Sequence, residues 1–291
     1  MKIKYYGYNA FVIEHAGLKL VIDPGKDLWI LNLDSLVPRK EWQQVSHILT
    51  THADPDHFAY AVKMAKESNA KVFCAEALID DFQSENVNNV FSIKVDSRVE
   101  QENITVEGLI TEHGTLPVDL LGGLIQMTNE VIKDNQAGKK IFLGPLKVFE
   151  SKENIPAYSR GTINILFGLI TLVKENIDFA RGSIGFKIKL GDRTIVNLGD
   201  TLLKQEWKGL KPDVLMLPIG GAAAHNTMDE KEALEAVKLI EPKAVIPCHY
   251  NCDFLWRKNA NPADDKMFKA EVEKLGIACH LMKPADELNL N

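Results

Sequence analysis

The sequence predicts an α/β protein, and three observations lead to this fold class. Short apolar runs typical of strands alternate with amphipathic helical stretches in both halves of the chain. Polar residues directly follow several of these runs, which is where α/β proteins commonly place their sites. The two halves share this strand-and-helix rhythm, and no repeat of short fixed period is present. We therefore expect an αββα sandwich that carries a helical insertion.

The first half is expected to begin with an antiparallel meander and to continue with alternating strands and helices. β-Branched and aromatic runs separated by glycine-containing turns indicate the meander. The predicted strands are 3–5, 10–14, 19–22, 46–51 and 71–74, and the predicted helices are 58–69 and 77–83.

The second half repeats this pattern after an irregular stretch. A short polar side chain, Thr227 or Asp229, is expected to cap its helix by accepting the free N–H groups of the first turn. The predicted strands are 104–112, 183–190, 194–198, 214–218 and 244–247, and the predicted helix is 229–240.

The stretch 115–180 is predicted to be a helical insertion, with helices drawn at 120–135 and 162–176. Its apolar clusters are unfavourable in water. They indicate a lid over an apolar substrate, a subunit interface of a homo-oligomer or, least expected, a patch that rests on a membrane surface. A plain packed helical hairpin is the alternative.

The composition is that of an ordinary globular chain of 291 residues, 45% hydrophobic and 25% charged. We expect a single domain over residues 1–291. The 34 basic and 40 acidic residues leave a net charge of −6, which gives no general attraction to phosphate backbones. We therefore expect a small-molecule substrate and no nucleic acid partner.

Export and membrane signals are not found in the sequence. The first residues run into a strand pattern without a basic and then apolar signal region. The longest apolar stretches, 120–127 and 163–173, are well short of the roughly 20 residues of a membrane-spanning helix. Four cysteines do not form a disulfide scaffold in a chain of this length. We expect a cytoplasmic protein.

Four potential metal ligands, His52, Asp54, Asp56 and His57, lie within six residues after the strand 46–51. Side chains at i and i+2 of an extended chain point the same way, so His52 and Asp54 can bind one ion. Asp56 and His57 follow in the turn and can bind a second ion. Imidazole and carboxylate donors suit zinc, iron or manganese. The alternative, that these residues only open the next helix, is weakened by four donors in one loop.

Further strand-like runs end at His113, Asp200 and His249. Each of these could be an ordinary turn residue by itself. Strand ends project their side chains into a shared crevice, which favours a role as ligands. His225 lies on the loop before the helix 229–240 and could donate a proton to a leaving group or bind an anion; an exposed loop histidine is the alternative.

Other polar residues near these motifs have weaker assignments. Asp23 is expected to brace the site loops, and Cys248 and Cys252, which flank His249, are expected to be buried neutral thiols. The further pocket candidates are Asn226, Tyr250 and Asn251, and the histidines expected to be structural or at the surface are His15, His47 and His280.

Taken together, the motifs resemble those of the metallo-β-lactamase fold hydrolases. The stretch 51–57 resembles the HxHxDH loop of that family. Similar stretches are 6–14, 21–24, 183–186, 195–201, 217–221 and 245–251. The resemblance covers about 1–114 and 181–260 and is specific to the fold rather than to a substrate. The nearest branch resembles small cytoplasmic hydrolases related to ascorbate-6-phosphate lactonase and to N-acyl phosphatidylethanolamine phospholipase D.

The resemblance implies a centre with two divalent metal ions. The implied ligands are His52, Asp54 and His113 for one ion, Asp56, His57 and His249 for the other, and Asp200 as a bridge. It also implies that Asp56 orients the attacking hydroxide, which makes Asp56 the candidate catalytic base. Asp54 departs from the family, where most members carry histidine. A carboxylate is a harder ligand, so it favours iron or manganese over zinc, and it could weaken the site until one ion is held.

The leading hypothesis for function is a metal-dependent hydrolase that adds activated water to a phosphodiester, lactone or related ester. One alternative is a di-iron redox protein of the same fold. The flavodi-iron proteins carry a carboxylate at the position of Asp54, but there is no room for their flavin domain after residue 260. A second alternative is a non-catalytic metal-binding protein.

Overall fold

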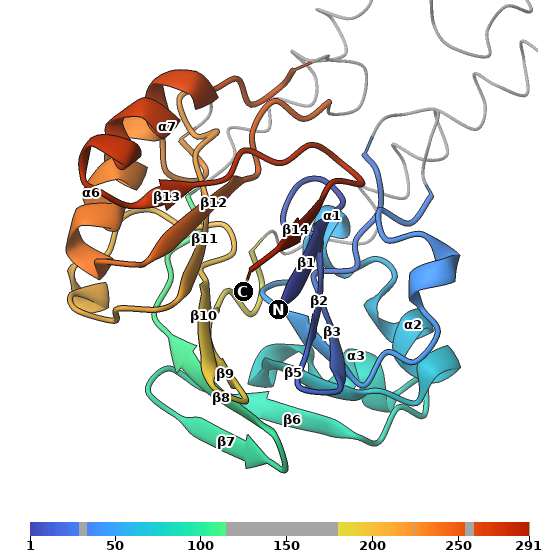
Figure 1. The fold of residues 1–291 in the computed structure, drawn as a ribbon. Helices are drawn as coiled ribbons and strands as arrows, with labels where there is room; N and C mark the ends of the chain where they lie inside the picture. Colours follow the sequence, from blue (N-terminus) through green and yellow to red (C-terminus); the bar gives the residue numbers. More distant parts are fainter. Residues whose placement is uncertain (29–33, 115–179, 224, 254–258, 291) are drawn as a thin grey trace, which may run out of the picture.

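The computed structural model describes residues 1–28, 34–114, 180–223, 225–253 and 259–290. Two seven-stranded sheets lie face to face, with helices on their outer sides, and the two chain ends meet between them (Figure 1). This arrangement confirms the predicted αββα sandwich. The predicted insertion 115–180 lies outside the described residues except for Ala180.

The first sheet holds the N-terminal half of the chain. Its first strands pair antiparallel, as the meander predicted, and β3 to β6 pair in parallel. In spatial order the strands are β14 (Glu287–Asn289), β1 (Lys2–Tyr5), β2 (Phe11–His15), β3 (Leu18–Ile22), β4 (His47–Thr50), β5 (Lys71–Ala75) and β6 (Val90–Ile93). The helices on this side are α1 (Pro55–Phe58), α2 (Ala61–Ser68) and α3 (Ile79–Gln83).

The second sheet is built on the same plan. β7 to β10 pair antiparallel, and β10 to β13 pair in parallel. In spatial order the strands are β13 (Ala278–Cys279), β12 (Ala244–Cys248), β11 (Val214–Pro218), β10 (Arg193–Asn197), β9 (Gly185–Leu190), β8 (Ile104–Leu109) and β7 (Arg98–Gln101). The helices on this side are α6 (Glu230–Ile240) and α7 (Asp265–Lys274). Along the described chain, single 3-10 turns occur at Arg39–Glu41, Glu76–Leu78 and Gln205–Trp207.

The core has three layers because the central strands are buried on both faces. In β2, Phe11 and Ile13 pack between the sheets, whereas Val12 packs under the helices of the first sheet. In β10, Ile195 and Val196 divide in the same way between the central layer and the layer under α6 and α7. Side chains alternate across a strand, so a continuous apolar run fills two layers at once.

The structure differs from the predicted elements at two places near the expected ligands. The helix predicted at 58–69 begins earlier, as α1, because Pro55 occupies its first turn, where a missing N–H costs nothing. Asp56 and His57 therefore lie on a helical turn rather than in a loop. The strand predicted at 104–112 ends at Leu109, so an extended segment carries the chain on to His113.

Other elements agree with the prediction or were not predicted. Asp229 caps α6, and its carboxylate accepts hydrogen bonds from the N–H groups of Lys231 and Glu232. The elements without a sequence-based prediction are β6, β7, β13, β14 and α7. Among the described residues, no helix combines the length and apolar character needed to cross a membrane.

Candidate metal centre

The predicted ligands come from separate segments and meet at one end of the sandwich. His52 and Asp54 follow β4, and Asp56 and His57 lie on α1. The remaining ligands, His113, Asp200 and His249, follow β8, β10 and β12. β10 and β12 both pair in parallel with β11, so their carboxyl ends share one edge of the second sheet, whereas β4 belongs to the first sheet.

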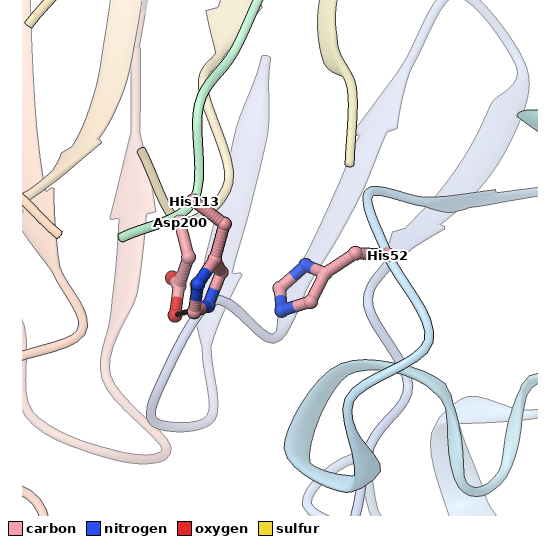
Figure 2. A group of neighbouring side chains, drawn as sticks. All are labelled: His52, His113 and Asp200. Carbon is pink, nitrogen blue, oxygen red and sulfur yellow. Dashed lines mark ion pairs between the residues drawn. The ribbon is translucent and has the colours of Figure 1, made fainter. Parts of the chain in front are cut away.

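The first ligand group consists of His52, Asp54 and His113. Asp54 Oδ2 lies 3.5 Å from His52 Nε2 and 3.6 Å from His113 Nε2. Figure 2 shows the ring of His52 on one side, with His113 and Asp200 together on the other. Donor atoms of His52, His113 and Asp200 all lie within 4.8 Å of one another. This spacing places the donors around a common point.

The second ligand group consists of Asp56, His57 and His249, and its donor atoms also lie within 4.8 Å of one another. Asp56 Oδ2 lies 3.4 Å from His57 Nε2 and 3.3 Å from His249 Nε2. Asp200 lies between the groups: its Oδ2 is 2.9 Å from His249 Nε2 and 3.7 Å from His113 Nε2. Asp200 can therefore contact ions at both groups.

Hydrogen bonds at Nδ1 turn the imidazole rings so that Nε2 faces the centre. His57 Nδ1 donates to Asp23 Oδ2 over 2.7 Å, and His113 Nδ1 donates to the carbonyl oxygen of Gly114 over 2.6 Å. The Thr51 hydroxyl donates to Asp23 Oδ2, so it accepts from His52 Nδ1 over 3.0 Å. An Nδ1 that carries the proton leaves the Nε2 lone pair for a metal.

Asp23 and Asp54 are held by partners outside the ligand groups. Asp23 is fully buried and accepts from Thr51 N, Thr51 Oγ1 and His57 Nδ1, which is the bracing role expected from the sequence. Asp54 Oδ1 accepts from Ala180 N over 2.8 Å. The other oxygen of Asp54 remains directed at His52 and His113.

Several donor atoms of the centre are buried without a hydrogen-bond partner among the described residues. They are Nε2 of His52, Nε2 of His57 and Oδ1 of Asp200. Buried polar atoms are normally paired because leaving them unpaired is costly. A cation between the two groups would satisfy all of these atoms, so the donor set fits divalent metal ions.

The protonation of the metal-free centre supports the same conclusion. Burial lowers the pKa of His249, but Asp200 and Asp56 outweigh this effect and raise it to about 9. Burial likewise lowers the pKa of His57, and the carboxylates Asp56, Asp200 and Asp23 raise it above its usual range. Burial raises the pKa of Asp200, and the facing imidazoles hold it below its usual range. The carboxylates therefore need positive charge, which metal ions can supply in place of protons.

His225 lies at the rim of the centre rather than in it. Its side chain is exposed, and its backbone lies beside Gly114, where an added Cβ would come within 2.1 Å of the His225 carbonyl oxygen. His225 and His249 both have left-handed backbone, with φ of 51° and 52°, a conformation that costs energy for residues other than glycine.

The other residues named from the sequence lie near the centre or far from it. Cys248 is buried and Cys252 half-buried, both are free thiols, and burial raises the pKa of Cys252 to about 12, as expected for neutral thiols. Asn226 and Tyr250 are buried, and Asn251 is exposed. His15 pairs with Asp192, His47 stacks on Phe73, and His280 is half-buried, so these histidines lie outside the centre.

The residues that support the ligands were mostly missed by sequence reasoning. Thr51, Asn9, Asn197 and Asn261 all contact a ligand or its immediate support, and Asn261 Nδ2 lies 3.3 Å from His249 Nδ1. Thr51, Asn9 and Asn197 fall inside motifs that resemble the family, which was the available signal. Asn261 lies twelve residues from His249 and gave none.

Two face-to-face sheets, with imidazoles and carboxylates at one edge, define a metallo-β-lactamase fold protein with a candidate binuclear centre. The family model of the beta-lactamase superfamily domain matches residues 2–249, so the chain belongs to this superfamily. A relative from Caldivirga maquilingensis, named a UPF0173 metal-dependent hydrolase, is 29% identical over 99% of this chain and 97% of its own length.

Solved structures show the same fold. Igni18, a metallo hydrolase from Ignicoccus hospitalis, matches with a TM-score of 0.65 and 20% identity, over 100% of this chain and 99% of its own. CmlA, a diiron β-hydroxylase from Streptomyces venezuelae, matches with a TM-score of 0.62 and 11% identity, over 99% of this chain and 54% of its own. These matches confirm the predicted fold, and the relatives' names confirm the predicted class, a metal-dependent hydrolase of the metallo-β-lactamase superfamily.

Proposed function

We propose that this hydrolase cleaves an ester-type bond of a small molecule, namely a phosphodiester, a lactone or a related ester. The observation that carries the proposal is the convergence of Nε2 atoms and carboxylate oxygens from both sheets on one point. We further propose that its closest functional relatives belong to the branch of ascorbate-6-phosphate lactonase and N-acyl phosphatidylethanolamine phospholipase D, and that it acts in the cytoplasm.

The donor set supports two divalent ions. In this proposal the first ligand group would hold one ion, the second ligand group would hold the other, and Asp200 would contribute to both. Zinc, manganese and iron all accept these donors. Bound ions would supply Lewis-acid polarisation of the electrophile and would lower the pKa of a bound water molecule.

Asp56 is proposed as the catalytic base. Burial raises its pKa, but His57 and His249 outweigh burial and hold the pKa below its usual range, so the carboxylate is ionised at neutral pH. One of its oxygens, Oδ2, faces both imidazoles. An ionised carboxylate in this place can orient a water molecule and accept its proton.

His225 is proposed as the group that protonates the leaving group. Its loop borders the segment that carries His113, so it lies on the side of the first ligand group. An imidazole in this place can give a proton to a departing alkoxide.

A substrate panel tests this function. The purified protein is stripped of metal, reloaded separately with Mn²⁺, Zn²⁺ or Fe²⁺, and offered generic phosphodiester, lactone and carboxylic ester reporters. We expect turnover of at least one reporter with at least one metal, and none in the stripped protein. Metal binding without turnover of any reporter would favour a non-catalytic metal-binding protein and contradict the ester proposal.

A di-iron redox protein is the second candidate, and two observations favour it. The carboxylate Asp54 replaces a nitrogen ligand in the first ligand group, and the diiron β-hydroxylase CmlA shares the fold. Carboxylate-rich sites suit iron. Reaction of the Fe²⁺-loaded protein with O₂, followed by the visible spectrum, separates the two functions. A new absorption band, together with no hydrolysis of any reporter, would favour the redox candidate.

A further inference from the structure

Two buried asparagines join the two sheets directly behind the metal centre. Asn9 lies between β1 and β2 of the first sheet, and Asn197 is the last residue of β10 in the second. Both side chains are fully buried. Asn9 Nδ2 donates to Asn197 Oδ1 over 3.0 Å, and Asn197 Nδ2 donates to Asn9 Oδ1 over 2.9 Å. The paired amides therefore form a reciprocal bridge between the sheets.

On the first sheet this bridge ends at the support of His57. Asn9 Nδ2 also donates to Asp23 Oδ2 over 2.6 Å, the oxygen that accepts from His57 Nδ1. Asn9 Oδ1 also accepts from Cys248 Sγ over 3.4 Å. All the hydrogen-bonding capacity of the Asn9 amide is used, so its orientation is unique.

On the second sheet the bridge ends beside Asp200. Asn197 Oδ1 also accepts from the N–H of Gly199 over 3.1 Å. Gly199 has left-handed backbone, with φ of +61°, and an added Cβ would come within 2.8 Å of Thr51 Cβ. The residue before Asp200 is therefore held by Asn197 and packed against the residue that supports His52.

The loop that carries Asn9 holds a third ligand. The carbonyl oxygen of Tyr8 accepts from the N–H of His249 over 2.8 Å. Tyr8 has left-handed backbone, with φ of 48°. The loop that carries Tyr8 and Asn9 thus contacts His249 directly. Through Asn9 it also reaches the supports of His57 and Asp200.

We propose that Asn9 and Asn197 are positioning residues that couple His57, which follows the first sheet, to Asp200, which follows the second. This inference rests on the proposed metal ligands. The paired amides fix Asp200 Oδ2 relative to His57 Nε2, a separation of 3.6 Å, and so set the affinity for the ion of the second ligand group. A purely structural role explains less, because apolar side chains join the sheets elsewhere, whereas both ends of this polar bridge meet ligand supports.

Titration of the metal-free protein with Co²⁺ tests the coupling, because its visible spectrum reports ligand geometry. The variants are Asn9→Ala, Asn197→Ala and the double variant, with thermal unfolding of each metal-free protein as a second measurement. Tyr6→Phe is the matched control: it removes a buried hydrogen bond from Tyr6 Oη to Glu41 Oε1, in the same connection between β1 and β2, without touching Asp23, Asn197 or the Tyr8 carbonyl oxygen.

We expect each single variant to weaken binding of one Co²⁺ ion by about 10–100-fold and to change its spectrum, as is typical when the support of a ligand is removed. The double variant should lose no more than about threefold beyond the worse single variant, because the two amides act as one unit. Tyr6→Phe should lower the melting temperature and keep Co²⁺ affinity and spectrum within about twofold of wild type.

Three results would overturn the inference: wild-type Co²⁺ affinity and spectrum in both single variants, equal losses in Tyr6→Phe, or additive losses in the double variant. If Asn9→Ala does not fold, Asn197→Ala tests the same bridge from the other sheet. Wild-type protein that binds no Co²⁺ would overturn the proposed metal centre as well, whereas normal wild-type binding with unchanged variants would overturn the coupling alone.

Discussion

Both ligand groups of the proposed centre depend on Asp23, which holds His57 directly and His52 through Thr51, but they differ in the support of Asp54. In the second ligand group, His57 is fixed by Asp23, a fully buried carboxylate that is itself held by Thr51 and Asn9. In the first ligand group, Asp54 is fixed by the backbone N–H of Ala180, at the border of the stretch 115–179.

His57 is therefore supported from within the core, whereas Asp54 depends on the segment after the proposed insertion. Ala180 has left-handed backbone, with φ of 66°, and Arg181 next to it forms a two-bond ion pair with Asp81 of α3. Ligands whose supports are rigid bind metal more tightly. We therefore expect the second ligand group to fill first.

Replacing the shared ligand has the largest expected effect. Asp200→Ala removes the carboxylate that lies between the groups, so both ions should be lost and hydrolysis should fall to background. His57→Ala should do the same at the second ligand group. Elemental analysis and reporter turnover measure both effects. Asp192→Ala, at an exposed turn, is the control that should keep full metal content, and full content in Asp200→Ala would reject the ligand assignment.

His225→Gln tests whether the leaving group departs on the side of the first ligand group. Loss of a proton donor should lower kcat by about 10²–10⁴-fold and leave the metal content unchanged, because His225 is not among the ligands. Steady-state kinetics with a reporter that has a poor leaving group measure the effect. A reporter with a good leaving group is the control, since it needs no proton. An unchanged kcat with both reporters would make His225 a bystander.

Metal affinity should depend on pH most strongly at the second ligand group. The metal-free protein holds a proton on His249, whose pKa is raised to about 9, and a metal must displace it. Because the pKa of His57 in the same group is raised as well, affinity should fall by at least about tenfold per pH unit below pH 9, or at least about 100-fold between pH 9 and pH 7. In the metal-free protein the same shift stabilises the fold below pH 6.5, and this contribution is lost as pH rises through about 9. Flat affinity over this range would contradict the geometry at His249.

Asp54→His tests whether the carboxylate sets the choice of metal in the first ligand group. A softer nitrogen donor should raise the ratio of Zn²⁺ to Mn²⁺ affinity at the first ligand group by about 10–100-fold. The ratio at the second ligand group should not change. Competition between the two metals, followed by elemental analysis, measures the ratio. The same affinity ratio in wild type and variant would show that Asp54 is not a metal ligand.

Arg181→Ala should give the smallest effect and only at the first ligand group. Without the ion pair to Asp81 the segment that carries Ala180 is less well held, so Asp54 should bind its ion about tenfold more weakly. Arg98→Ala, which removes an exposed ion pair, is the control. Stepwise Mn²⁺ titration distinguishes the two ions. An equal loss at both ions would show that the two groups are not supported independently.

Much of the fold could be predicted from the sequence because β-branched runs and helical periodicity are local signals. β-Branched runs and helical periodicity located most strands and the helix α6. The short edge strands β13 and β14 were not predicted, since they form only by pairing with β12 and β1. The helix after β4 begins at Pro55, about one turn before the predicted start, although the proline is itself a local signal.

The proposed ligands could be predicted as residue types at strand ends, but apart from Asp23 their supports could not. Asn9 and Asn197 are 188 positions apart, and each resembles an ordinary turn or strand residue by itself. The support of Asp54 is equally distant in sequence, because Asp54 Oδ1 accepts from the backbone N–H of Ala180, 126 positions away. A backbone N–H carries no residue identity, so no sequence pattern marks it.

By itself the sequence determined which side chains can bind a cation and that they follow strands, because donor chemistry and local periodicity are properties of single residues and short stretches. Only the tertiary structure decided that these side chains meet, which imidazole nitrogen faces inward and what holds each ring. The meeting of these side chains and the support of His57 by Asp23 depend on contacts between residues far apart in the chain, and strand pairing and the packing of the two sheets create those contacts.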